Sequence, residues 1–361
     1  MDVQKLNDVL PDVYKSFLSP FFESAIPVES AATCSDCVML KHHGTGYLEG
    51  NFFSKDAKCC TFHPMLSNYL IGAILTGNSP EYECGRKRLR EKIKQKIGVL
   101  PHGIIPPPKY SLLRKHSQIN SFGKTKQLVC PYYISREGAC AVWPYSGSLC
   151  NTWFCKYAAG QEGKTFWTAL KEYMEGVEKT LIHFVLHNTG FESHQIIRIE
   201  SQDNPLTIEE LDDLPPDKET YRSIWGEWGG REEELYRESY RLITELTPEK
   251  FDYIEGIAQK IQRENIIKAY KRMMEPQLPE KLMRNPFLRV SKTGDESYAL
   301  VGYSSLDPLE VPKRIYDMID YFDGIHSNDK ICELIRDRMN IQPSEDLLIT
   351  LYQFRILIEN K

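Results

Sequence analysis

The chain has 361 residues, of which 41% are hydrophobic and 26% charged, and its formal net charge is −5 at pH 7. This length allows two or three domains, and the composition is ordinary for a soluble globular protein. The negative charge attracts neither nucleic acid nor an anionic membrane. Residues 1–5 lack the features of a secretory signal, and no apolar run approaches the roughly 20 residues of a membrane helix. We therefore expect a cytoplasmic protein with no membrane partner.

In chain order, the first 25 residues carry apolar side chains at helical spacing and predict an amphipathic helix that Pro11 kinks. Residues 33–60 are rich in glycine and irregular, as expected where metal ligands dictate the geometry. Helices are predicted over residues 65–75 and 83–97, and the second is strongly basic, with the character of a solvated face. The prolines at 106–108 predict an interruption of regular structure.

After residue 160 the pattern becomes helical. Apolar residues recur every three or four positions from Phe166 to Phe184 and predict a long core-facing helix. Helices over residues 231–245 and 248–274 complete a helical module that we assign to residues 161–285.

The last part of the chain, residues 286–361, has a different pattern. Residues 287–291 and 298–303 flank a turn and predict a β-hairpin, and three helices follow over residues 308–322, 327–339 and 343–358. A hairpin with three helices is a winged-helix plan. The predicted fold class is therefore α+β, mostly α, with an irregular metal domain over residues 1–160, the helical module, and a winged-helix domain.

Cysteines dominate the first domain, which contains nine of the ten in the chain. In a reducing compartment, clustered cysteines bind metal more often than they pair. The Cys34-x2-Cys37 spacing lets two thiolates reach one ion. Adjacent Cys59 and Cys60 would point in opposite directions in an extended chain, so the pair could serve two metals, or one metal and a packing role. Buried free thiols without metal are the alternative.

The cysteine pattern resembles that of the YkgJ-like family, described as zinc- or iron-chelating, and is similar to that of flagellin lysine methylases. The similarity covers about residues 30–157. The Arg-Pro of the family is replaced here by Ser146-Gly147, and 21 residues separate Cys37 from Cys59 where the family is compact. The matching residues are Cys34, Cys37, Cys59, Cys60, Cys130, Pro131, Gly138, Cys140, Val142, Trp143, Cys150 and Phe154.

Four thiolates suit either a 4Fe–4S cluster or tetrahedral zinc, and eight or nine suit two sites. Aromatic residues around the late cysteines predict a water-poor shell, which favours one or two iron–sulfur clusters and leaves zinc as the alternative. His42, His43 and His63 are candidate substitute ligands, and Cys332 is expected to be a core residue. The predicted metal ligands are Cys34, Cys37, Cys59, Cys60, Cys130, Cys140, Cys150 and Cys155, with Cys84 added although it lies outside the family pattern.

Two weaker motifs have structural interpretations. Residues 158–165 match the loose form of a phosphate-binding loop, but a cysteine region precedes them where that loop needs a strand, so we expect only the start of a helix. His183 and His187 lie four residues apart without the glutamate of a metalloprotease helix, so we interpret them as structural.

The last domain resembles the PqqD-like peptide-recognition domain in pattern and length. That resemblance implies a groove in which a peptide docks as an added strand. Residues 286–361 contain nine Lys and Arg against thirteen Asp and Glu, a balance of −4 that opposes DNA binding. A packing role is the alternative.

These observations predict a metal-cluster protein that acts in peptide or protein modification, with a peptide or protein as its partner. One alternative is an enzyme of the lysine methyltransferase type, as the methylase resemblance suggests. Another is a metal- or redox-sensing DNA-binding regulator, which the charge disfavours. No acid–base constellation or cofactor loop identifies a reaction, so the sequence leaves open whether the chain is itself an enzyme.

Overall fold

The computed structural model describes residues 3–29, 37–40, 52–117, 121–200 and 208–360. The protein is mostly helical with several small sheets, as the α+β prediction required. No helix in the described ranges is long and apolar enough to cross a membrane.

The helices vary from one turn to eight turns. They are α1 (Asn68–Thr76), α2 (Glu83–Gln95), α3 (Pro108–Lys115), α4 (Ser148–Asn151), α5 (Gly160–Asn188), α6 (Ser193–Glu200), α7 (Ile208–Leu211), α8 (Lys218–Trp225), α9 (Glu232–Thr244), α10 (Pro248–Ile254), α11 (Ile257–Met274), α12 (Lys313–Ile319), α13 (Asn328–Met339) and α14 (Glu345–Gln353). The strands are β1 (Val3–Lys5), β2 (Ala25–Pro27), β3 (Leu66–Ser67), β4 (Val99–Leu100), β5 (Gly103–Ile104), β6 (Tyr133–Ile134), β7 (Ala139–Cys140), β8 (Leu282–Arg284), β9 (Arg289–Gly294), β10 (Ser297–Val301), β11 (Leu309–Pro312) and β12 (Leu357–Glu359).

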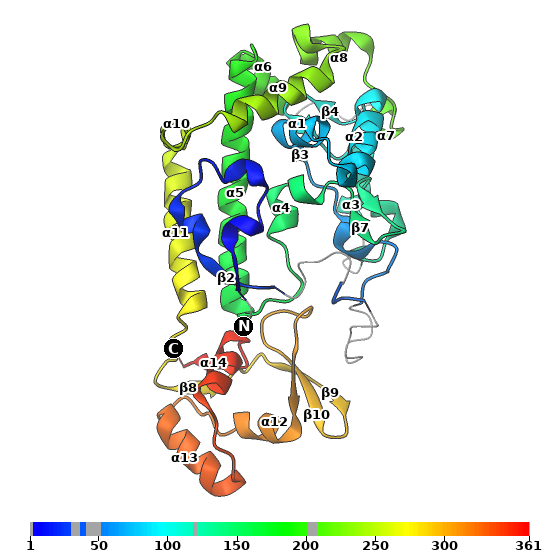
Figure 1. The fold of residues 1–361 in the computed structure, drawn as a ribbon. Helices are drawn as coiled ribbons and strands as arrows, with labels where there is room; N and C mark the ends of the chain where they lie inside the picture. Colours follow the sequence, from blue (N-terminus) through cyan, green and yellow to red (C-terminus); the bar gives the residue numbers. More distant parts are fainter. Residues whose placement is uncertain (1–2, 30–36, 41–51, 118–120, 201–207, 361) are drawn as a thin grey trace.

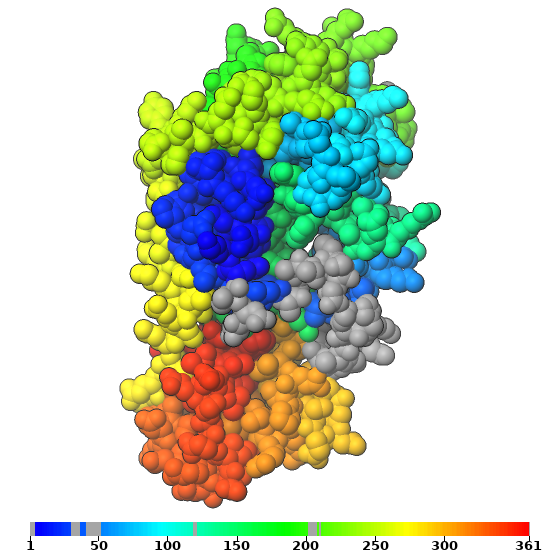
Figure 2. All heavy atoms as spheres, viewed as in Figure 1, coloured from blue at the N-terminus to red at the C-terminus, as the bar shows by residue number. Residues whose placement is uncertain are grey.

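The N-terminal segment does not form the predicted amphipathic helix. Strands β1 and β2 pair antiparallel, and three short 3₁₀ turns lie between them. Pro11 and Pro20 lack backbone N–H groups, which a continuous helix would need. The apolar side chains, such as Leu10 and Phe17, are still buried, so the periodicity identified core residues but not their conformation. Figure 2 shows this blue segment lying against the yellow surface of α11.

Helices α1 and α9 cross at unusually close range. Every side chain of α1 from Asn68 to Leu75 is buried. A Cβ atom built on Gly72 would lie 1.8 Å from the carbonyl oxygen of Tyr236 in α9, so a residue with a side chain cannot occupy this position without displacing a helix. Helix α11 packs along α5, and Figure 1 shows the two side by side.

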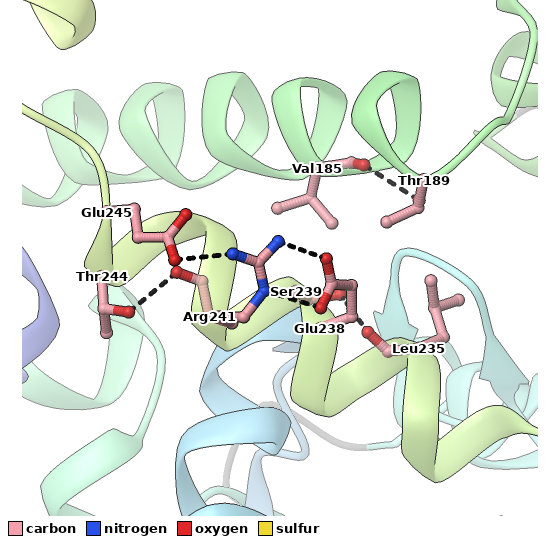
Figure 3. Close-up of polar contacts among 8 residues, drawn as sticks. All are labelled: Val185, Thr189, Leu235, Glu238, Ser239, Arg241, Thr244 and Glu245. Atoms are coloured by element: carbon pink, nitrogen blue, oxygen red, sulfur yellow. Dashed lines mark hydrogen bonds and ion pairs between the residues drawn. The ribbon is translucent and has the colours of Figure 1, made fainter.

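Helix α9 is held by its apolar side. Figure 3 shows polar contacts of this helix beside α5, where Arg241 lies between Glu238 and Glu245 at 2.6 Å from each carboxylate. Exposed ion pairs of this kind contribute about 0–1 kcal/mol. The fully buried Tyr236 and Ile243 contribute more, since they add to the central core.

The predicted helix over residues 248–274 is two helices. Glu255 and Gly256 adopt extended conformations between α10 and α11 and end the first helix. Because the break changes the helix phase, Ile261 is exposed rather than core-facing, and Ile266 and Met273 are buried instead. The helices α6 and α8 complete this region.

Two large hydrophobic cores contain most of the buried apolar side chains that the structure describes. One extends from Leu6 to Met273 and includes residues on both sides of the predicted boundary at residue 160. The other extends from Leu282 to Leu357 and lies entirely in the C-terminal part. Figure 1 shows this part, in orange and red, beyond one end of α5.

The C-terminal part contains the predicted hairpin and three strands that were not predicted, β8, β11 and β12. Strands β9 and β10 pair antiparallel, and β11 pairs with the other side of β10, giving the sheet order β11-β10-β9. The predicted helix over residues 308–322 was therefore wrong at its start: Leu309–Pro312 form β11 and only Lys313–Ile319 are helical. Likewise, Leu357–Glu359 end the last predicted helix by pairing with β8.

Candidate metal centre

Five cysteines line one cavity of about 460 Å³, which we call the sulfur cavity. They come from four separate places in the sequence: Cys59 and Cys60, Cys130, Cys140, and Cys150. The other walls are mainly aromatic and aliphatic, and include Tyr132, Val142, Trp143 and Trp153. The fold thus gathers thiols that lie up to 91 positions apart in the chain around a single apolar space.

Backbone hydrogen bonds bring the first three places together. The backbone N–H of Cys130 donates to the carbonyl of Cys60 at 2.7 Å. Strands β6 and β7 then place Cys140 opposite Tyr133, three residues after Cys130. The buried Lys58 ammonium donates to the Gly138 carbonyl at 2.7 Å and joins the Cys59–Cys60 turn to the same hairpin.

Helix α2 supplies positive charge beside these thiols. The Arg88 guanidinium donates to the carbonyls of Pro131 and Tyr133, and the second bond measures 3.0 Å. Both Arg88 and Lys92 interact electrostatically with Cys130, and partial burial lowers the pKa of Lys92. Together with Lys58 these cations would offset the negative charge of a thiolate-bound centre.

Burial controls the protonation of the thiols. It raises the pKa of Cys130 to about 12, and it also raises the pKa of Cys155. The pKa of Cys59 is lowered, first by a hydrogen bond from Cys60 and also by the charge of Lys58. Thiols such as Cys130 and Cys155, whose pKa is raised by burial, stay protonated at neutral pH. A bound metal ion would be needed to hold them as thiolates.

A second group of sulfurs lies beside the sulfur cavity. Cys37, Cys59 and Cys155 pack together with Met39 and Leu40, and with Phe53, Phe122 and Leu306. Cys59 and Cys37 are the thiols that act electrostatically on Cys155. Cys59 thus belongs to this outer group and also lines the sulfur cavity, whereas its neighbour Cys60 lines the cavity only.

The remaining predicted ligands have different positions. Cys34, His42 and His43 lie outside the described residues. Cys84 lies near the start of α2 and does not line the sulfur cavity, and Cys332 packs against the C-terminal core. Within the described ranges, no three His, Cys, Asp or Glu side chains already stand at coordinating distances from one point. The thiols share a cavity wall but are not gathered on one position.

A second, polar cavity of about 470 Å³ adjoins the first and shares Phe62, Pro64, Gly147 and Leu149 with it. We call it the acidic cavity because three carboxylates line it, against one lysine. Its charged and imidazole residues are Glu175, Glu178, Lys179, Glu200, His63 and His102.

The buried groups of the acidic cavity have shifted pKa values. Burial raises the pKa of Glu178 to about 7, although its carboxylate accepts a 2.6 Å hydrogen bond from the Ser148 N–H. Burial lowers the pKa of His63 to about 3 and that of His102 to about 4, so both imidazoles are neutral. His63 Nε2 and His102 Nδ1 have no hydrogen-bond partner among the described residues. His183, considered above with His187, instead bonds Glu200 at 2.6 Å.

Sequence reasoning missed the supporting residues of both cavities. Lys58 directly precedes the Cys59–Cys60 pair, so the sequence indicated that it lies near these thiols. Nothing in the sequence indicated that it would be buried. Arg88 and Lys92 belong to a helix that was interpreted as a solvated face, and only the packing of α2 against the 131–133 segment shows their role. Glu178 lies within the apolar pattern of α5 and gave no signal.

Comparison with protein-family models, with curated proteins and with solved structures gave no match to this chain. The candidate centre is therefore argued from its own residues.

Proposed function

We propose that this chain is a metal-cluster protein, with iron–sulfur favoured over zinc, that acts in peptide or protein modification. The observation that carries the proposal is the convergence of Cys59, Cys60, Cys130, Cys140 and Cys150 on one apolar cavity. Isolated core cysteines would be expected in separate places. A group of thiols flanked by the buried Lys58 and the partly buried Arg88 and Lys92 fits a thiolate-bound centre, which supplies electron transfer when it is iron–sulfur.

The adjacent cysteines support two centres rather than one. Cys60, Cys130, Cys140 and Cys150 would form the inner ligand set, and Cys37, Cys59 and Cys155 would form the outer set with Cys34, whose place comes from the sequence prediction alone. Four thiolates per centre meet the requirement of a 4Fe–4S cluster or of a zinc ion. Cys84 is left out because it neither lines the sulfur cavity nor packs with the outer group of sulfurs.

The walls of the sulfur cavity favour iron–sulfur. Tyr132, Val142 and Trp143 place apolar surface beside the thiols, and solvent exposure is one of the properties that tune such clusters. Four thiolates would hold zinc equally well. The apolar walls therefore favour iron–sulfur, but the ligand set fits both metals.

The deciding experiment is the quantification of iron, zinc and acid-labile sulfide in protein purified without oxygen. We expect about four iron and four sulfide per chain for one cluster, or about eight of each for two. The protein should be brown, with absorption at about 400 nm. Stoichiometric zinc without sulfide would replace the cluster by zinc sites, and the absence of both would leave only buried thiols.

For the C-terminal part we propose a PqqD-like peptide-binding role. Strand β9 pairs with β10 on one side, and no other described strand pairs with its outer side. A peptide could add to that edge as a further strand. Binding of candidate substrate peptides to the full chain, with a Pro substitution at Lys292 in β9 as the variant, tests this role: proline removes a backbone donor, so binding should weaken.

A second candidate function is protein modification of the lysine methyltransferase type, and the acidic cavity favours it. Glu175, Glu178 and Glu200 offer carboxylates to an ammonium group close to the sulfur cavity. A peptide with a free lysine should then bind more tightly than its acetyl-lysine counterpart, and Glu200→Gln should reduce the difference. Mass spectrometry of peptides incubated with the chain and a methyl donor would detect the product. Equal binding of both peptides contradicts this candidate.

A further inference from the structure

The mouth of the sulfur cavity carries large aromatic side chains that are partly exposed, and metal binding by the cysteines does not explain them. Trp143 and Trp153 line the cavity and are 38% and 44% exposed. Phe122 lies edge-on to Trp153, with ring centroids 5.9 Å apart. Large aromatic side chains are costly to expose, and together with arginine they are the residue types that dominate binding sites.

Arg114 is the one charged residue among the described side chains that line the sulfur cavity. It projects from α3, and its guanidinium carbon lies 3.8 Å from the centroid of the Phe62 ring, which also lines the cavity. Within the described ranges, no carboxylate forms an ion pair with it. Stacking on Phe62 fixes the plane of the guanidinium, whose fork of donors matches a carboxylate.

We propose that the mouth of the sulfur cavity binds an aromatic or branched aliphatic carboxylic acid, with Arg114 holding the carboxylate and Trp143 and Trp153 packing on the apolar body. The cavity volume of about 460 Å³ lies within the range of small-molecule sites. The acid is either a free molecule or the C-terminal residue of a peptide. This inference rests on the proposed function, because the acid would be the group presented to the metal centre.

The test is calorimetric titration of the full chain with matched probes. Indole-3-acetate carries the carboxylate, indole-3-acetamide is its neutral counterpart, and tryptamine carries a positive charge. We expect the acid to bind about tenfold more tightly than the amide, since one charge-assisted pair contributes that factor, and tryptamine to bind more weakly still. A Gly-Gly-Trp peptide, with its C-terminus free or amidated, shows whether the source is a peptide.

Variants separate the two parts of the site. Arg114→Gln should reduce the preference for the acid over the amide to about twofold, and Arg114→Lys should keep part of it. Lys115→Gln, one residue along the same helix, should leave the preference unchanged. Trp153→Ala should weaken the acid and the amide alike, because it removes stacking and not charge.

Equal affinity for acid and amide, an Arg114→Gln variant that keeps the preference, or no saturable binding of any probe would each overturn the proposal. Iron and sulfide are measured in the same samples. Acid binding without iron leaves this site standing and rejects the iron–sulfur centre, and iron without acid binding does the reverse. Circular dichroism of each variant shows that a loss of binding is not a loss of fold.

Discussion

Two neighbouring residues, Cys59 and Cys60, determine how the sulfurs divide. They lie in a 3₁₀ turn (Lys58–Thr61) that begins at Lys58, which has a positive φ of 50°. Lys58 also anchors this turn through its ammonium. Neighbouring side chains in a 3₁₀ turn point about 120° apart, so one thiol of the pair can serve the inner ligand set and the other the outer set.

The division predicts how iron content responds to single substitutions. Cys140→Ser should remove the inner centre and Cys155→Ser the outer one, so each variant should keep about half of the iron of the wild type. The double variant should contain none. Iron and sulfide assays on purified variants check this.

Cys332→Ser is the matched control, because that residue packs against the separate C-terminal core. Its iron content should equal that of the wild type. If Cys155→Ser also leaves the iron unchanged, the outer group is only a packing cluster.

The buried Glu178 predicts a pH dependence of stability. Burial raises its pKa from 4.5 in the unfolded chain to about 7 in the folded protein. The folded state therefore keeps a proton that the unfolded state releases, and the contribution of Glu178 to the free energy of unfolding should fall as pH rises from 4.5 to 7 and then level off. The full shift corresponds to about 3 kcal/mol.

Glu178→Gln should remove this contribution, because the amide oxygen can still accept the Ser148 N–H bond without a charge to bury. The shifted groups Glu29, His63 and His102 keep their own contributions in both proteins, so the difference between the two profiles reports Glu178. Urea unfolding of both proteins across this pH window measures the difference. Glu172→Gln, an exposed change on the same helix, should behave like the wild type. Parallel pH profiles for Glu178→Gln and the wild type would show that the carboxylate is not the cause.

At the scale of elements, the site depends on close contacts between backbones. Gly85 in α2 faces the carbonyl oxygen of Ala141, and a Cβ atom there would lie 2.4 Å from it. This approach places α2, with Arg88 and Lys92, next to the segment that follows Cys140. Glycine positions therefore hold the basic helix against the thiols.

The α1–α9 crossing gives a testable consequence. Gly72→Ala should destabilise the protein by about 1–3 kcal/mol, since the new methyl group must displace α9, although alanine is the better helix former. Chemical denaturation measures the change.

Gly176→Ala in α5 is the control for the same substitution. Its nearest neighbours are glutamine side chains at 3.1 Å and beyond, which can move aside. This variant should be as stable as the wild type or slightly more stable. A neutral Gly72→Ala would mean that the two helices separate at little cost.

The β10–β11 connection joins the C-terminal sheet to the sulfur cavity. Asp307 accepts a 3.0 Å hydrogen bond from the Tyr157 N–H and another from the Tyr303 hydroxyl, and Leu306 lines the sulfur cavity. Asp307→Ala should leave those donors without a partner and cost about 1–3 kcal/mol. Limited proteolysis should then cut this connection faster, whereas Asp295→Ala, in the exposed β9–β10 turn, should not change the rate.

At the scale of the whole molecule, two hydrophobic cores share one chain. The core from Leu6 to Met273 surrounds the sulfur cavity, and the core from Leu282 to Leu357 holds no part of it. Removal of metal should therefore destabilise the first core and leave the second intact.

Thermal unfolding followed by circular dichroism checks this expectation. Metal is removed from the wild-type protein anaerobically with a chelator. The unfolding transition of the first core should then disappear or move to a lower temperature, and the transition of the second core should keep its temperature. A uniform shift of both would mean that the two cores unfold as one unit.

Much of the helical content followed from the sequence, because periodic apolar residues report the side of a helix that must be buried. Helices α2, α5, α9 and α13 occur close to the predicted positions. Prediction failed where chain ends and breaks are set by neighbours. The failures are the N-terminal turns, the break at Glu255–Gly256, strand β11, which pairs with the preceding strand β10, and strand β12, whose partner β8 lies far away in sequence. Periodicity carries no information about such partners.

The sequence by itself determined that sulfur chemistry is concentrated in the first 155 residues, since residue types and spacing are local properties. It could not determine which thiols meet, or that Lys58, Arg88 and Lys92 support them. Those facts depend on which backbones approach one another, and only the tertiary structure decided that. The same reason applies to the acidic cavity and to Arg114: burial and proximity create their chemistry, and neither is written in the local sequence.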